Sequence, residues 1–277
     1  MGLLLALLAV SGVSTWSHAN SLDWPQEFRA CGGAAQSPID LPDICDRNGG
    51  VTVDPQQAIE FSGYNVDLPA EKLDLVNTGH TLSLKLRNSD ESADNGSPGI
   101  HYKGNFFQFS ELHFHWAASG EEGSDHTMSG QRHAAEVHMV HYNTKYKRMT
   151  NAVWKQDGLL VLGTILKSDH EVNEAIQSIL EKVDDVITPH RPTFLRSPLN
   201  LASLIPARPD SFYSYTGSLT TPPCAEPVTW IIFVEKGKIS SAQLGQLKRL
   251  SGGEDKLRDI MPLNNRNILA SSDDHCK

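Results

Sequence analysis

An alternation of apolar and polar residues with a period of two is the feature that most limits how this chain can fold. Residues 81–86 alternate over six positions, which is typical of a strand with one buried face. Two mainly apolar runs, residues 159–166 and 228–234, indicate strands that are covered on both faces. Further strands are predicted at residues 107–109, 112–116 and 135–142. The pattern therefore predicts a large sheet.

Helical periodicity is seen in two shorter stretches. One apolar helix face is formed by Val172, Ile176, Ile179, Leu180 and Val183. A short second helix is indicated by the spacing of Leu244, Leu247 and Leu250. Frequent turns are expected from 21 Gly and 15 Pro in 277 residues, which argues against a helical bundle. We predict a mainly β fold in one domain, with a large central sheet and helices at its periphery.

The charge balance excludes one broad class of function. The chain has 24 Lys and Arg against 33 Asp and Glu, a net charge of −9 with neutral His, and no block of basic residues. Nucleic-acid binding needs clustered cations to contact phosphates, so we predict no nucleic-acid partner. The 12 His are the unusual number, and several of them lie close together in the sequence.

The N-terminal residues predict export. Residues 3–10 form an apolar run that is too short to span a bilayer but has the length of a signal-peptide core. Small residues offer cleavage after Ala19 or near Ser14, and we expect a signal peptide at 1–19 and a single domain at 20–277. No later run is long enough for a membrane helix, and the polar C-terminus excludes a lipid-anchor signal. The expected product is soluble, secreted and extracellular, without a membrane anchor.

The cysteines are consistent with export. Cys31, Cys45, Cys224 and Cys276 show no CxxC spacing, which argues against a zinc ribbon or a thioredoxin-like motif. An exported protein is expected to contain at least one disulfide, and spacing alone leaves every pairing open. Asn95 begins a possible N-glycosylation motif.

Histidines on two of the predicted strands suggest a metal centre. His113 and His115 are two residues apart and therefore share one face of their strand, and Glu136 and His138 share a face in the same way. If the two strands are neighbours, three imidazoles converge. Three His with one open position form the donor set of a catalytic zinc site. His141 falls on the opposite face and is interpreted as a core residue or as one that supports a ligand without binding the metal.

A plainer interpretation must be weighed against this one. A lone buried His is more often a hydrogen-bonded core residue than a ligand. The HxH pair, the third His and the carboxylate two residues before it together favour the ligand set. The turn at residues 217–224 contains Thr220 and Thr221, whose hydroxyls would suit a metal-bound oxygen, followed by two prolines that stiffen the turn. By itself a Thr-Pro turn is usually only a turn.

Longer motifs give a family resemblance. His113-Phe114-His115-Trp116, Ala135-Glu136-Val137-His138 and residues 217–223 resemble the three signature segments of the alpha-class carbonic anhydrases. The similarity runs in order from about Trp24 to Ile268. Supporting motifs are Gln36-Ser37-Pro38-Ile39-Asp40, Asn77-Thr78-Gly79-His80, Gly123-Ser124-Asp125-His126-Thr127, Val161-Leu162-Gly163 and Trp230.

The resemblance implies a fold and a reaction. The fold is a large, mostly antiparallel, twisted sheet with a conical cavity that reaches a zinc ion. The reaction is the reversible hydration of carbon dioxide to bicarbonate and a proton, by zinc-hydroxide attack with a His proton shuttle, so the expected enzyme is a carbonate dehydratase, a zinc lyase. Its small-molecule partners are carbon dioxide, bicarbonate and buffer.

The resemblance also assigns roles to single residues. His113, His115 and His138 match the zinc ligands, and His80 matches the proton shuttle. Thr220 matches the threonine that orients the zinc-bound hydroxide, with Asp125 at the position of the carboxylate that accepts its proton. The remaining matches are Thr221 at the substrate, Val140, Val161, Leu219 and Trp230 in the apolar wall, Glu111 and Glu136 beside the ligand rings, and Cys31 with Cys224 in a disulfide.

One departure from the family bears on activity. The family has Glu where this chain has Asp125, and Asp is shorter by about 1.5 Å. A hydrogen bond of about 2.7 Å cannot stretch by that much. Either the backbone at residues 124–125 moves inward, or a water bridges, or Thr220 loses its orientation; the first two preserve activity and the third lowers it.

Three further departures leave questions for the structure. Trp16-Ser17-His18 is the nearest match to the Trp-x-Tyr element with which the family begins, and if it belongs to that element, cleavage falls near Ser14. Residues 252–262 look shortened, which leaves the backbone partner of the His115 ring open. Glu111 replaces the usual Gln, and its carboxylate either strengthens the bond to His113 or is solvated.

Two rival functions remain. The first is a non-enzymatic, carbonic-anhydrase-like binding module, although such modules typically lose a zinc-ligand His. The second is a zinc esterase or hydrolase whose substrate is not carbon dioxide. Zinc content tests the first rival, and a comparison of carbon dioxide hydration with ester hydrolysis tests the second.

Overall fold

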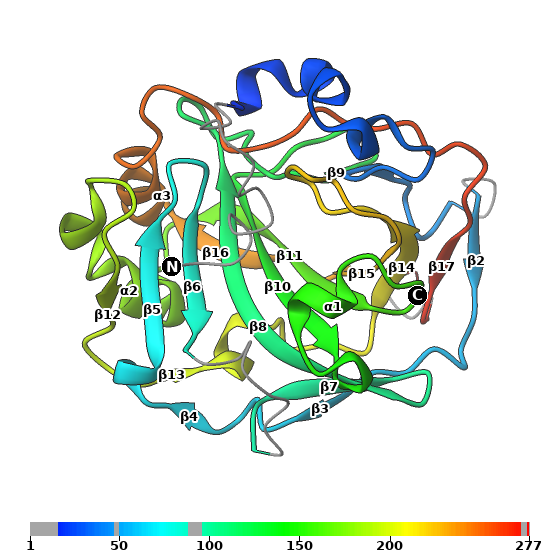
Figure 1. Ribbon diagram of the computed structural model, residues 1–277, viewed down its shortest axis with the longest axis horizontal. Helices are drawn as coiled ribbons and strands as arrows, with labels where there is room; N and C mark the ends of the chain where they lie inside the picture. The colour runs from blue at the N-terminus through cyan, green and yellow to red at the C-terminus, as the bar shows by residue number, and fades with distance from the viewer. Residues whose placement is uncertain (1–15, 47–49, 88–95, 273–275, 277) are drawn as a thin grey trace.

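Two long neighbouring strands, β8 (Asn105–Trp116) and β10 (Ala135–Asn143), form the middle of the fold (Figure 1). The predicted strands at 107–109 and 112–116 belong to the single strand β8. The antiparallel register places His113 opposite His138, and it shifts between Val140 and His141, where a bulge interrupts the ladder. Every residue of β10 is buried, so both of its faces are covered.

The computed structural model describes residues 16–46, 50–87, 96–272 and Cys276. Its other strands are β1 (Asp40–Leu41), β2 (Val51–Val53), β3 (Glu60–Ser62), β4 (Asp67–Leu68), β5 (Leu73–Asn77), β6 (Leu82–Leu86), β7 (Gly99–Tyr102), β9 (Thr127–Met128), β11 (Leu159–Asp169), β12 (Thr193–Phe194), β13 (Leu199–Asn200), β14 (Phe212–Gly217), β15 (Val228–Phe233), β16 (Gly237–Ser240) and β17 (Ile268–Ala270). The α-helices are α1 (Met149–Ala152), α2 (Glu174–Leu180) and α3 (Ser241–Lys248). The 3-10 helices are η2 (His18–Gln26), η3 (Arg29–Gly32), η4 (Ala70–Lys72), η5 (Thr144–Tyr146), η6 (Val183–Val186) and η7 (Leu201–Leu204).

Thirteen strands of the described residues form one large sheet with the order β12-β5-β6-β8-β10-β11-β15-β14-β17-β2, to which β16, β7 and β3 are added at the sides. Two small sheets lie outside it, one formed by β1 and β9 and the other by β4 and β13. Most neighbours are antiparallel. The sheet is mixed, however, because β11 runs parallel to β15 and β16, and β17 runs parallel to β2. The mainly β fold with peripheral helices is confirmed.

The helices lie at the edge of the sheet, with α2 and α3 at one side of the view in Figure 1. The side chain of Asn173 accepts a hydrogen bond from the Ile176 N–H and begins α2, and a capping box between Ser240 and Gln243 begins α3. The predicted helix at 172–183 is shorter in the structure, because α2 ends at Leu180 and a separate 3-10 turn follows. None of the helices in the described residues is long and apolar enough to cross a membrane.

The two faces of the central strands enter different cores. Phe114, Val137 and Met139 belong to a large apolar cluster on one face, as strand parity requires. On the other face, Val140 and Trp230 belong to a second apolar cluster. The predicted metal ligands have the parity of Val140 and therefore lie on the second face.

Two disulfides close long loops of the chain. Cys31 is bonded to Cys224, as the family resemblance implies, and Cys45 is bonded to Cys276. The first bond ties η3 to the turn that carries Thr220. Asn95 and most of the predicted signal peptide lie outside the described residues.

Candidate metal centre

Three histidine rings meet on one face of the sheet. His113 and His115 come from β8, and His138 comes from the opposed position of β10. The ring centroids are 4.3 Å apart for His115 and His138, and 5.2 Å apart for each of the other two pairs. One nitrogen of each ring lies within 4.8 Å of a nitrogen of the other two, which is the spacing needed to hold a single metal ion. The strand parity read from the sequence thus brings the three rings together.

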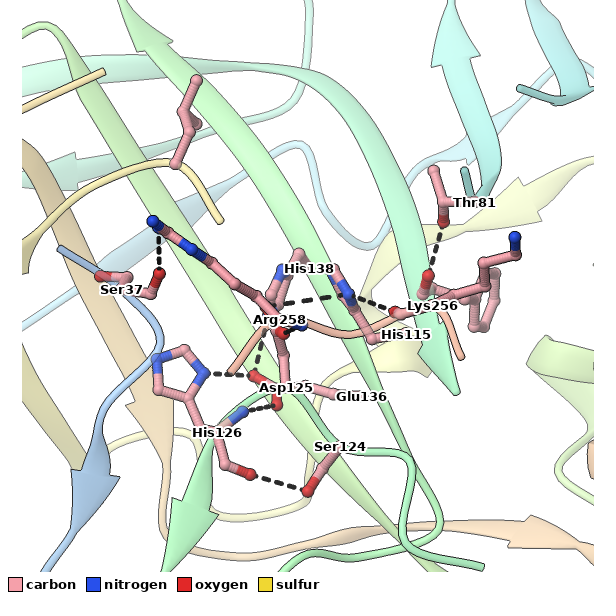
Figure 2. Close-up of polar contacts among 12 residues, drawn as sticks. Ser37, Thr81, His115, Ser124, Asp125, His126, Glu136, His138, Lys256 and Arg258 are labelled. Carbon is pink, nitrogen blue, oxygen red and sulfur yellow. Dashed lines mark hydrogen bonds and ion pairs between the residues drawn. The ribbon is translucent and has the colours of Figure 1, made fainter. Parts of the chain in front are cut away.

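Each ring is oriented by a bond on one of its nitrogens. His115 Nδ1 is 2.8 Å from the Lys256 carbonyl oxygen, and because a carbonyl only accepts, Nδ1 carries the proton. His138 Nε2 donates to Glu136 Oε1 at 2.8 Å, as Figure 2 shows. His113 Nδ1 lies 3.4 Å from Glu111 Oε1. The backbone partner left open by the shortened segment at 252–262 is therefore Lys256.

The opposite nitrogens have the properties of metal ligands. His115 Nε2 and His138 Nδ1 are buried and have no hydrogen-bond partner among the described residues. Buried polar atoms are nearly always paired, so two such atoms in one place call for an additional partner. Burial also lowers the pKa of His138 and lowers the pKa of His115 well below its ordinary value, partly opposed by Glu136 and Asp125 respectively. The His115 and His138 rings are thereby kept neutral, as a metal requires, and the three-nitrogen donor set fits Zn²⁺.

Glu136 is the centre of a buried hydrogen-bond network that the sequence did not predict in full. Its carboxylate accepts bonds from His138 Nε2, from the backbone N–H of His126 and from His126 Nδ1, each at 2.8 Å. His126 Nε2 is left to accept from the Tyr215 hydroxyl, which is 2.7 Å away. Burial opposes ionisation of Glu136, but the two His side chains outweigh it and hold its pKa well below the usual value. The network therefore supplies a fixed anion to the His138 ring.

The neighbouring strand β11 leaves room for this network. Gly163 pairs with His138 in the register. A Cβ at Gly163 would lie 2.5 Å from the side chain of Ile232 and 3.1 Å from Glu136 Oε1. A side chain at this position would therefore displace the end of the Ile232 side chain and press on the carboxylate.

Glu111 is buried rather than solvated. Only 6% of its surface is exposed, and its other oxygen lies 3.1 Å from the Lys85 ammonium. Burial alone would raise the pKa of Glu111, but Lys85 and His113 lower it to about 2. The carboxylate therefore remains charged beside the His113 ring.

Asp125 is completely buried but does not contact Thr220 by a direct hydrogen bond. Its Oδ1 accepts from the backbone N–H of Arg258 at 2.8 Å, and its Oδ2 has no hydrogen-bond partner in the described part of the chain. Burial raises the pKa of Asp125, and His115 and His138 outweigh it, so the net pKa is lowered. The carboxylate is ionised and has one oxygen left to accept a bond.

Arg258 holds the surroundings of Asp125 in place, and it was not predicted from the sequence. Its guanidinium is buried and donates to Gln36 Oε1 and to the carbonyl oxygens of Ser37 and Cys31. Burial lowers the pKa of Arg258 to about 10, which still leaves it charged at neutral pH. Nothing in the local sequence pattern distinguishes it from an exposed Arg, because residues 252–262 have no periodicity.

A pocket opens directly over the ligands. The predicted substrate residues line this pocket together with two of the three histidines and Glu111. The complete lining is Glu111, His113, His138, Val140, Val161, Leu219, Thr220, Thr221 and Trp230. Val140, Val161 and Trp230 lie side by side on β10, β11 and β15. The side of the pocket formed by these strands is apolar. The turn at residues 217–224 contributes Thr220 and Thr221 to the lining.

His80 lies apart from the ligands, in a group of aromatic rings near the N-terminal end of the described chain. Its ring stacks on Trp16, with centroids 3.7 Å apart and planes at 10°. Trp16 also contacts His18 and Trp24, each at 5.1 Å. Burial, together with Lys256, lowers the pKa of His80 to about 4. We refer to Trp16, His18, Trp24 and His80 as the N-terminal aromatic group.

A cluster of three histidines that could hold a metal ion, below a pocket in a large mixed sheet, is typical of one class of zinc enzymes. Comparison with known sequences identifies the family, since the profile of the eukaryotic-type carbonic anhydrases matches residues 19–272. The chain belongs to this family and is a carbonate dehydratase, a lyase. The family supports carbon dioxide as the substrate and zinc as the metal, and the three-histidine cluster for such a metal is present.

Two relatives show the extent of the similarity. The chain is 33% identical over 267 residues to carbonic anhydrase 6 of Canis lupus familiaris, which covers 91% of this chain and 79% of the relative. It is 32% identical over 284 residues to carbonic anhydrase 6 of Homo sapiens, which covers 95% of this chain and 87% of the relative. The resemblance found in the sequence motifs is therefore confirmed.

Proposed function

We propose that this protein hydrates carbon dioxide reversibly at a zinc ion held by His113, His115 and His138. The observation that carries the proposal is a pair of buried nitrogens, His115 Nε2 and His138 Nδ1, which have no hydrogen-bond partner in the described part of the chain and belong to rings whose opposite nitrogens are fixed. When bound, zinc would make a water acidic enough to act as a nucleophile near neutral pH, an effect for which carbonic anhydrase is itself the standard example. The protein's part is to fix the ligand rings, hold the substrate and remove a proton.

The pocket residues divide substrate binding between them. Val140, Val161 and Trp230 offer an apolar surface to carbon dioxide, which has no net charge, with Leu219 beside them. The Thr220 backbone N–H is proposed to donate to the oxygen that gains negative charge, and Thr221 to contact bicarbonate. The Thr220 hydroxyl is proposed to orient the nucleophile and to donate its own proton to a water that bridges to Asp125 Oδ2. This oxygen suits the bridge because it is buried, belongs to an ionised carboxylate and has no partner among the described residues.

His80 is proposed to accept the proton that the reaction releases and to deliver it to buffer. An imidazole with an ordinary pKa near 6.5 suits this task. Stacked on Trp16, His80 has a pKa of about 4, so it stays neutral and binds a proton only weakly in this position. Swinging away from Trp16 into solvent would restore the ordinary pKa, so this motion would let the ring retain the proton and then release it.

The proposal is tested by measuring zinc stoichiometry and carbon dioxide hydration on the same purified protein. We expect about one zinc per chain and rapid hydration. Protein without zinc and without hydration would support the binding-module alternative. Ester hydrolysis that proceeds faster than carbon dioxide hydration would support the hydrolase alternative.

We also propose that the protein is exported and that its signal peptide is cleaved near Ser14. Trp16 and His18 pack with Trp24 and His80, so cleavage after Ala19 would remove two members of this group. Two disulfides fit an oxidising compartment. The intact mass of the secreted chain decides the site; a mature N-terminus directly after Ala19 would overturn this part of the proposal.

A further inference from the structure

His18 is a buried histidine that the proposed reaction has not yet used. It begins η2, has 5% of its surface exposed, and lies where the family's opening element has Tyr. Its ring makes edge contacts with Trp16 at 5.1 Å and Trp24 at 5.9 Å, and its centroid is 6.3 Å from that of His80. Packing thus holds the ring beside the proposed proton shuttle.

Neither nitrogen of His18 has a hydrogen-bond partner among the described residues, although both are buried. A neutral imidazole has one donor and one acceptor, on opposite sides of the ring. A ring with both sides unsatisfied suits two water molecules, one on each side. Within the described residues no acceptor selects its tautomer, so the proton can reside on either nitrogen.

The charged and titratable groups around His18 come from both ends of a route. On one side, Trp24 packs against His18 and its ring lies 5.2 Å from the Arg258 guanidinium, while the Arg258 backbone N–H donates to Asp125 of the metal centre. On the other side lies His80, next to the Gly79 carbonyl that accepts from the Lys256 ammonium. Burial is the largest effect and lowers the pKa of His18 to about 3; Asp125 opposes it, and His80, Lys256 and His113 add to it. The ring therefore stays neutral at pH 7 and can pass a proton on without retaining it.

We propose that His18 is a proton-relay residue between the metal centre and His80. A proton from water on the metal side binds the unprotonated ring nitrogen while the proton on the other nitrogen leaves to water on the His80 side. Before the next transfer, the metal-side nitrogen gives its proton to a water off this route and the other nitrogen takes a proton from water, which restores the first tautomer without returning a proton to the metal centre. His18 is not proposed to touch the substrate. It acts through water and His80, and in this sense it is a positioning residue. This inference rests on the proposed hydration of carbon dioxide.

The test compares the zinc-loaded wild type with His18→Phe, which keeps an aromatic ring but has no nitrogen. We expect zinc content and kcat/KM to be unchanged within about twofold, and kcat at low buffer concentration to fall about tenfold. Added imidazole buffer should restore kcat. His170→Phe removes an exposed imidazole and should change none of these values.

The outcomes separate the relay from the proposed function. Wild type without zinc or hydration would overturn both. An active wild type with an equal kcat in His18→Phe would overturn the relay alone, and so would an equal loss of kcat and kcat/KM.

A second measurement needs no variant and no activity. Long-range nitrogen–proton correlation spectra of the wild type report the His18 tautomer, in zinc-free as in zinc-loaded protein. We expect averaged nitrogen shifts from two exchanging tautomers. A single fixed tautomer would overturn the relay, even if His18→Phe does not fold.

Discussion

The metal centre and the N-terminal aromatic group hold their histidines in opposite ways. In the metal centre, Lys256 O and Glu136 each accept a bond from one nitrogen of a ligand ring, and the other nitrogen is left for the metal. In the N-terminal aromatic group, stacking and edge contacts position the rings of His80 and His18. Both His18 nitrogens are unpartnered in the described part of the chain.

The difference shows how one side chain serves two kinds of chemistry. An acceptor on one nitrogen fixes the tautomer and so determines which nitrogen is offered to a metal. Ring packing fixes the plane of an imidazole but leaves its tautomer free. Coordination therefore needs a protein acceptor on one ring nitrogen, whereas a proton relay needs a ring whose nitrogens are left to water. The following variants test this division, beginning with the largest expected effect.

Removal of a ligand ring should have the largest effect. In His138→Ala, we expect most of the zinc to be lost and carbon dioxide hydration to fall by roughly a thousandfold or more, because two nitrogens cannot replace a three-nitrogen site. Metal analysis and stopped-flow hydration provide the measurements. His101→Ala on β7, which removes an exposed imidazole, is the matched control. Unchanged zinc content in His138→Ala would contradict the ligand assignment.

Thr220→Ala should have the next largest effect and should leave the zinc in place. Loss of an orienting group at a developing charge typically lowers kcat by about a hundredfold. Asp125→Glu should change kcat by less than about tenfold, because a longer side chain restores the reach that the family's carboxylate has. A larger loss of kcat in Asp125→Glu than in Thr220→Ala would show that the packing beside Arg258 accommodates only the shorter carboxylate.

Glu136→Gln should weaken zinc binding by about 10–100-fold with a smaller effect on kcat. Glu136 accepts bonds from three N–H groups, and an amide must turn one donor toward them. Competition with a chelator measures the affinity. The matched comparison is Glu111→Gln, where His113 and the Lys85 ammonium face the carboxylate and the family resemblance implies Gln. Equal losses in the two variants would contradict the idea that Glu136 fixes the tautomer.

The part of the site that could be predicted from sequence is the part that depends on strand parity. His113, His115 and His138 share a face because each strand alternates, and this needs no knowledge of distant contacts. Lys256, Tyr215 and Arg258 come from segments about 80–140 residues away from the residues that they contact, and their local sequence carries no periodic signal.

The same limit applies to the fold. The apolar run at 159–166 correctly indicated a buried central strand, but hydrophobicity does not encode whether its neighbours run parallel or antiparallel. Alternation located β6, β8 and β10, because the two faces of each strand have different surroundings and therefore carry different kinds of residue. The bond between Cys45 and Cys276 could not be assigned, since spacing does not select among pairings.

His141 sharpens the comparison, because it is a buried ring in β10 that is fixed by hydrogen bonds but belongs to neither group. Its Nε2 lies within hydrogen-bond distance of the Tyr64 hydroxyl, and its Nδ1 is 3.3 Å from the Leu160 carbonyl. Burial lowers the pKa of His141 from 6.5 to about 3. With both nitrogens engaged, this ring is neutral and structural.

The pH dependence of stability follows from that pKa. Between about pH 6.5 and pH 3 the unfolded chain binds a proton at His141 and the folded chain does not, so stability is full above this range and falls as the pH falls. From about pH 7.5 to about pH 5, His141 should cost the folded state about 2 kcal/mol. Urea unfolding of the zinc-free protein should therefore show a decline that is smaller by about this amount in His141→Asn. Equal declines in the two proteins would mean that the ring accepts a proton in the folded state, and its fixed, neutral character would then be wrong.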